Sequence, residues 1–160
     1  MASTLLRAAP DFRIIATSGA GDRRGTAAAL WCHGKADIEA GDTASAQPRL
    51  NEALRSFQSF QMGAEMIGCL EDHARLAHPM GSAERAVCLN AAAAGPRDRL
   101  ALPRAPRKEV RWQRERAALS ELLGGSAFDT ARSEGKGWDV GEAIRHALPF
   151  ADGVDNSRPL

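Results

Sequence analysis

The sequence contains no tyrosine, and aromatic residues make up only 5% of the chain. Sheets are enriched in aromatic and β-branched residues, so this composition argues against a barrel or a sandwich. No apolar run approaches the roughly 18 residues that a membrane-spanning helix needs. The apolar residues near the N-terminus are interrupted by Arg7, Pro10, Asp11 and Arg13. We therefore expect neither a membrane span nor a signal peptide.

The sequence also lacks a large excess of charge of one sign and cysteines spaced for disulfide pairing. The formal net charge is +1, which predicts no general attraction to nucleic acid or to an anionic membrane. The three cysteines, Cys32, Cys69 and Cys88, are odd in number and far apart, so they do not define a disulfide framework. Reduced thiols are typical of a cytosolic protein, and we expect a cytoplasmic location.

What the chain does contain is alanine-rich helical sequence. Its 160 residues are 44% apolar, which is enough for one domain with a core. Apolar and small residues recur at steps of three and four, the period of an amphipathic helix. The pattern in one stretch returns forty positions later: Leu30, Gly34, Gly41, Asp42, Ala46, Leu50 and Ala53 correspond to Leu70, Ala74, Gly81, Ser82, Ala86, Asn90 and Ala93. Two copies of a helical hairpin are typical of a solenoid.

The expected fold class is therefore all-α, with tetratricopeptide-like antiparallel hairpins forming an α-solenoid that C-terminal helices cap. We expect one long helix and two short capping helices beyond a proline-containing linker. The expected organisation is a poorly ordered segment at 1–22, two hairpins at 23–94, a linker at 95–107, a helix with short capping helices at 108–150, and a frayed tail at 151–160.

Particular residues predict where these helices turn, start and end. Gly41 and Gly81 are expected to adopt the left-handed conformation that ends a helix, and Gly95 with Pro96 should end the fourth helix. Pro48 should kink the second helix or delay its start.

Caps and core positions are predicted in the same way. Asp42, Ser82, Ser126 and Asp139 are expected N-caps, Asp139 with Glu142 at capping-box spacing. The fifth helix, from about Lys108 to Leu123, should bury Trp112, Leu119 and Leu122.

The C-terminal third carries a family resemblance. Its motif residues are Leu123, Gly124 and Phe128, then Ala131, Glu134 and Gly135, then Asp139, Glu142 and Ala143. The run from Leu119 to Leu148 resembles the closing segment of large bacterial transcriptional regulators, which carry an ATPase module followed by tetratricopeptide-like repeats.

The resemblance extends through the segments 21–31, 40–54 and 83–94 and covers residues 21–148. Such regulators include proteins that end in a LuxR-type helix-turn-helix and proteins that begin with a nucleotide cyclase domain. The chain lacks the Gly-rich phosphate loop ending in Gly-Lys-Ser or Gly-Lys-Thr, so the ATPase activity does not carry over to it.

Two groups of residues are candidate chemical sites. Cys69 and His73 are four apart on one expected helix, and Cys32 and His33 lie on its neighbour. Zinc sites use closely clustered ligands such as Cys-x-x-Cys, and the chain has no such cluster. Buried thiols and surface histidines are therefore favoured over the alternative function, a small metal-binding protein or metalloenzyme. Ser126 follows two glycines but lacks the Gly-x-Ser-x-Gly turn of a nucleophile, which favours a helix cap.

A basic segment is the best functional lead in the sequence. Residues 97–116 contain eight basic and three acidic side chains, so the segment carries +5 and the rest of the chain −4. Arg107, Arg111 and Arg114 are spaced to share one helix face and are the candidate partner-binding residues. A solvated linker and helix face is the plainer interpretation, and a nucleic-acid-binding module is the rival function.

We expect a non-catalytic protein-interaction or regulatory scaffold, with no cofactor, no metal and no catalytic residue. A protein or peptide partner is the favoured partner, ahead of nucleic acid. A short concave groove between the stacked hairpins is the expected binding surface.

Overall fold

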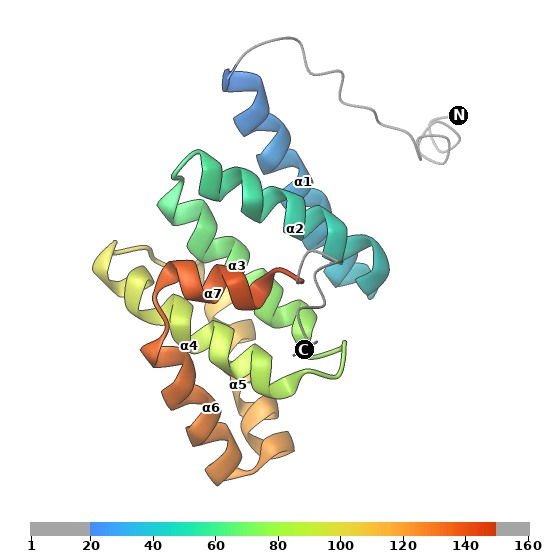
Figure 1. Cartoon of the computed structure of the whole chain (residues 1–160). Helices are drawn as coiled ribbons and strands as arrows, with labels where there is room; N and C mark the ends of the chain where they lie inside the picture. The colour runs from blue at the N-terminus through green and yellow to red at the C-terminus, as the bar shows by residue number, and fades with distance from the viewer. Residues whose placement is uncertain (1–19, 150–160) are drawn as a thin grey trace, which may run out of the picture.

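The computed structural model describes residues 20–149, which fold into seven α-helices packed antiparallel against their neighbours (Figure 1). The described part of the chain contains no strand. The helices are α1 (Ala20–Ala40), α2 (Thr43–Ser59), α3 (Gly63–Ala77), α4 (Ala83–Arg99), α5 (Pro106–Leu123), α6 (Gly125–Gly137) and α7 (Val140–Ala147). The all-α prediction is confirmed. The predictions for the terminal residues up to 19 and from 150 onward lie outside the described residues.

The turns between the first helices are built alike. Gly41 and Gly81 have φ of 76° and 81°, which confirms the predicted left-handed helix ends. The same turn follows α2 and α4, where Gln61 and Ala101 have φ of 55° and 48°. A residue with a Cβ costs roughly 1 kcal/mol or more in this conformation, so sequence inspection gave no reason to expect a left-handed residue at these two positions.

Each of these turns closes its helix with the same pair of backbone hydrogen bonds. After α1, the Gly41 amide donates to the Ile38 carbonyl at 3.1 Å and the Asp42 amide donates to the Asp37 carbonyl at 2.9 Å. After α2, the Gln61 amide donates to the Gln58 carbonyl at 3.1 Å, and the Met62 amide makes the second bond of the pair, to the Phe57 carbonyl. These bonds satisfy carbonyls that a helix end leaves free.

The core lies between successive helices. Its largest fully buried side chains come from α2, α3 and α4, and they are Phe57, Leu50, Leu54, Ile67, Leu70, Leu89 and Cys69. Close approach between α1 and α2 depends on Gly34, because a Cβ there would lie 2.8 Å from a methyl carbon of Leu50. Helix α6 packs against α4, and α7 crosses α3 and α4 in front of them in the view of Figure 1, while α5 lies behind α4.

Two predicted boundaries are wrong at the ends of the hairpin region. Helix α1 begins at Ala20, so its first residues lie in the segment expected to lack fixed structure. Helix α4 continues through Gly95 and Pro96 to Arg99, and the connection to α5 shortens to residues 100–105. Proline removes one helical hydrogen bond, and the next residue, Arg97, forms an ion pair with Glu71 of α3 that holds this end of α4 in place. Pro48 likewise lies inside α2, which starts at Thr43 without delay.

The predicted caps are confirmed in part. Asp42 accepts a hydrogen bond from the Ser45 amide at 3.0 Å, and Asp139 accepts one from the Glu142 amide at 2.7 Å. Ser82 occupies the N-cap position of α4 without a side-chain hydrogen bond. Ser126 is not a cap, because α6 already begins at Gly125 and the N-cap is Gly124.

Helix α5 buries less than its sequence suggests. Leu119 is buried, Trp112 is half-buried, and Leu122 is 62% exposed. The prediction that Leu122 is buried is wrong because α5 packs along a single side, against α4 and α6.

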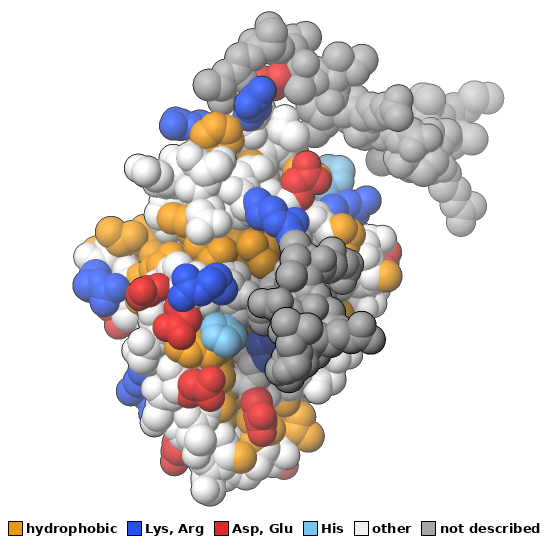
Figure 2. Space-filling model, viewed as in Figure 1, with side chains coloured by type: hydrophobic (Ala, Val, Ile, Leu, Met, Phe, Trp, Pro, Cys, Tyr) orange, Lys and Arg blue, Asp and Glu red, His pale blue; other side chains and the backbone are white. Residues whose placement is uncertain are grey.

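None of the helices in residues 20–149 has the length and apolar character required to span a bilayer. On the face that carries α7, basic and acidic side chains are interspersed, and a band of apolar side chains crosses the middle (Figure 2). The described part of this face therefore presents no large patch of one charge.

Candidate functional site: a charged groove between α1, α3 and α5

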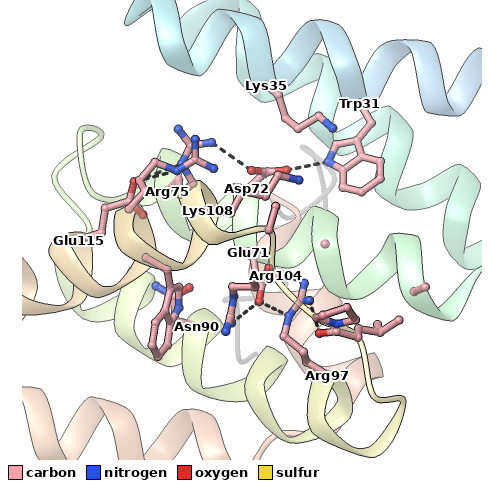
Figure 3. A pocket seen from close by; sticks show the side chains of 17 residues that line it. Trp31, Lys35, Glu71, Asp72, Arg75, Asn90, Arg97, Arg104, Lys108 and Glu115 are labelled. Carbon is pink, nitrogen blue, oxygen red and sulfur yellow. Dashed lines mark hydrogen bonds and ion pairs between the residues drawn. The ribbon is translucent and has the colours of Figure 1, made fainter.

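A groove with a volume of about 360 Å³ lies between α1, α3, the connection after α4, and α5. Its volume falls near the lower end of the range for ligand sites. Small residues, Ala64 and Gly68, line it on α3, and Trp31 and Trp112 line it from α1 and α5. The remaining lining is mostly charged (Figure 3).

Glu71 joins three parts of the chain in this groove. Both of its carboxylate oxygens accept hydrogen bonds from Arg97 at 2.7 Å, and one also accepts from Arg104 at 2.6 Å. All three side chains are at most 16% exposed. Arg97 donates a further bond to the Leu102 carbonyl at 2.9 Å. The bidentate geometry thus ties the end of α4 and the following connection to α3.

Asp72 makes the corresponding link to α1. Its carboxylate accepts a hydrogen bond from the Trp31 indole at 2.8 Å and another from Arg75 at 3.2 Å. Burial raises the pKa of Asp72, while the indole and the Arg75 guanidinium act in the opposite direction. The side chain is therefore buried with hydrogen-bond partners, as buried polar groups in proteins generally are.

Arg75 extends this network to α5. It donates to Glu39 at 2.7 Å and to Glu115 at 3.2 Å, and Arg111 donates to the same Glu39 oxygen at 2.8 Å. Glu39 is 59% exposed, so its pairs with Arg75 and Arg111 contribute little free energy individually. Together they connect α1, α3 and α5 across one end of the groove.

The two lysines of the groove differ from its arginines. The Lys35 ammonium lies 4.1 Å from the centroid of the Trp31 ring, a cation–π contact. Lys108 is exposed and lines the groove from α5. Within residues 20–149 neither lysine has a carboxylate within ion-pair distance. These two ammonium groups are thus available to a ligand.

The predicted partner-binding residues divide between two places. Arg111 lines the groove, but its guanidinium is paired with Glu39. Arg107 and Arg114 are exposed on α5 outside the groove lining. Of the three predicted residues, Arg111 alone therefore lines the groove.

Sequence reasoning missed the acidic residues of α3 and Lys35 of α1. Glu71 and Asp72 are adjacent charged residues in a helix whose other inward positions, apart from His73, are apolar, which is a detectable signal of buried pairing. Lys35 gives no such signal, because a single lysine on a helix is ordinarily a surface residue.

Cys69 and His73 lie together in the core rather than in the groove. The Cys69 sulfur is 3.8 Å from His73 Nδ1, which is 2.9 Å from the Cys69 carbonyl oxygen, and His73 Nε2 is 3.1 Å from the Asn51 side-chain oxygen. Burial lowers the pKa of His73 to about 4 and raises that of Cys69. Cys32 is exposed on α1.

No cluster of three or more His, Cys, Asp or Glu side chains suited to a metal occurs between residues 20 and 149. The Cys69–His73 pair therefore has no third ligand within this range.

Comparisons of the chain with protein-family models, with curated proteins and with solved structures found no match.

Proposed function

We propose that this protein is a non-catalytic interaction scaffold, and that the groove between α1, α3 and α5 is its binding surface. The observation that carries the proposal is the construction of the groove. Side chains from three helices and one connection are fixed by hydrogen bonds through Glu71, Asp72 and Arg75. A surface held in place before binding loses little conformational entropy when a ligand binds.

The finer architecture that we propose is a tetratricopeptide-like solenoid of stacked hairpins. The left-handed turn residues, at 41, 61, 81 and 101, follow one another at intervals of 20 residues. Helices α2, α3 and α4 start at 43, 63 and 83, again 20 apart. A hairpin of two such helices gives the period of forty seen in the sequence, and constant repeat length supports a repeat array.

In such an array one helix of each hairpin lines the concave surface. The groove is lined mainly by the first helix of each pair, α1, α3 and α5, which supports its assignment as the binding surface. The proposed relationship to the repeat region of bacterial ATPase-type regulators is consistent with a regulatory role in the cytoplasm.

A nucleic-acid-binding role would use the basic segment at 97–116. Three of its arginines, Arg97, Arg104 and Arg111, are already paired with carboxylates of the protein. This reduces the positive charge left for phosphates, which dominate affinity for nucleic acid. The pairing favours the protein-interaction role.

The test blocks the groove directly. Ala64 is exposed in the groove lining, whereas Ala36 is exposed on α1 outside it. A random octapeptide library is panned against the full chain, and the selected peptides are measured against Ala64→Trp and Ala36→Trp. We expect Ala64→Trp to abolish binding and Ala36→Trp to preserve it. Peptides that bind both variants equally would reject the groove as the binding surface.

A further inference from the structure

Resting on the proposed function, we propose that the groove binds an extended acidic peptide segment, with carboxylates of the ligand pairing with Lys35 and Lys108. These lysines come from opposite sides of the groove, α1 and α5. A ligand with two acidic side chains in an extended segment would join the two helices.

The charge of the groove supports an anionic ligand. Six cationic side chains line it against three acidic ones, Glu71, Asp72 and Glu115. Glu39 and Glu109, which also pair with arginines of this set, reduce the surplus from +3 to +1. This positive surplus is small, but it is concentrated at the two lysines. The arginines of the groove are paired with carboxylates, whereas the lysines are not paired within residues 20–149.

The shape of the groove supports a linear ligand. Its lining on α3 runs from Ala64 to Arg75, which is roughly 16 Å along the helix axis. An extended chain covers that length with about five residues. Ala64, a small and exposed lining residue on α3, leaves space for a backbone at one end of this path.

The lysines suit a transient carboxylate contact better than the arginines do. Each arginine that pairs with Glu71 is largely buried, and moving it toward a ligand would remove one of the two partners of that carboxylate. The Lys35 ammonium lies over the Trp31 ring and near Asp72, where its charge acts to lower the pKa of that carboxyl. A flexible stem lets the ammonium turn toward a ligand.

The aromatic residues of the groove favour a peptide over single-stranded nucleic acid. Proteins bind single-stranded nucleic acid by stacking its bases on the faces of aromatic side chains. Lys35 lies over the Trp31 ring, while Arg104 and Arg116 lie 4.4 and 5.6 Å from the Trp112 centroid. Bases would have to displace these side chains before stacking.

The experiment uses the full chain and the octapeptide library described above. We expect peptides blocked by Ala64→Trp to be enriched in Asp and Glu. For the tightest of them, measured by fluorescence anisotropy, Lys35→Gln with Lys108→Gln should raise Kd about tenfold or more, and Lys35→Arg with Lys108→Arg should restore binding to within about threefold. Far-UV circular dichroism checks that each variant is folded.

The matched control neutralises two exposed arginines of α5 outside the groove. Arg107→Gln with Arg114→Gln removes the same charge and should change Kd by less than about twofold at moderate salt. The proposal of an acidic ligand would be overturned if the peptides whose binding Ala64→Trp blocks were neutral or basic, or if they bound the lysine double variant with unchanged Kd. Either result would still leave the groove as a binding surface.

Two other outcomes are separate. Failure to obtain any peptide that Ala64→Trp blocks would reject the proposed function itself. Tighter binding of a single-stranded oligodeoxythymidylate than of any selected peptide, lost in the lysine double variant, would assign the groove to nucleic acid and overturn the inference.

Discussion

Replacing Gly68 by alanine should disturb the contact between α1 and α3 that shapes the groove. A Cβ at position 68 would lie 2.7 and 2.8 Å from two carbons of the Trp31 ring, closer than van der Waals contact. The ring would have to move, and its indole donates the 2.8 Å hydrogen bond to the buried Asp72. The substitution therefore strains packing and weakens one hydrogen bond at once.

The magnitude follows from three contributions to the free energy of unfolding. Overpacking costs about 1–3 kcal/mol, and a buried carboxylate that loses a partner costs about 1–3 kcal/mol more. Alanine gains up to about 1 kcal/mol over glycine in a helix interior. The expected net loss is about 1–5 kcal/mol, a large share of the stability of a domain of this size.

The assay is urea unfolding followed by far-UV circular dichroism. Gly63→Ala at the start of the same helix is the matched control, because its Cβ would meet only a Leu100 methyl at 3.8 Å, an ordinary contact. We expect Gly63→Ala to be neutral or slightly stabilising. If Gly68→Ala were as stable as Gly63→Ala, the close contact between Trp31 and α3 would be refuted.

Three further predictions concern the core and the floor of the groove. Burial lowers the pKa of His73 to about 4 in the folded protein, whereas in the unfolded chain this histidine binds a proton below about pH 6.5. The difference contributes about 3 kcal/mol to the free energy of unfolding above pH 6.5, and this contribution is lost as the pH falls to about 4. Unfolding curves measured across this pH range should show that loss of stability, and the loss should be smaller in His73→Gln. An equal dependence of stability on pH in the two proteins would contradict the prediction. Gly135→Ala should destabilise by about 3 kcal/mol or more, since its Cβ would overlap the Cys88 backbone, whereas Gly137→Ala, with nothing within 4 Å, should not; similar unfolding midpoints for both would refute the close crossing of α4 and α6. Glu71→Gln should cost about 2 kcal/mol by leaving two largely buried arginines without their carboxylate, and an unchanged midpoint would show that the pairs contribute nothing.

Helix positions were largely predictable from the sequence because they depend on local pattern. Steps of three and four locate α1 to α4, and Gly41 and Gly81 mark two turns. The turns at Gln61 and Ala101 were not predictable, because their left-handed conformation is imposed by hydrogen bonds of the helices that they end. The continuation of α4 through Pro96 similarly depends on contacts outside the helix.

The groove was much less predictable, since it depends on side chains distant in the sequence. Glu71 and Arg104 are 33 residues apart, and Trp31 and Asp72 are 41 apart. Nothing local indicates these partners. The basic segment directed attention to α5, but its charge in isolation did not show that Arg97, Arg104 and Arg111 are paired inside the protein.

The central claim is that the groove between α1, α3 and α5 is the binding surface, and the three tryptophans provide its most direct test. Trp31 and Trp112 line the groove, whereas Trp138 lies elsewhere in the fold and stacks on His146, with 3.9 Å between the two ring centroids. We would record the three indole N–H resonances by NMR while titrating a library-selected peptide. Shifts of Trp31 and Trp112 with Trp138 unmoved are the predicted result. A shift of Trp138 alone, or none at saturating peptide, would contradict the claim.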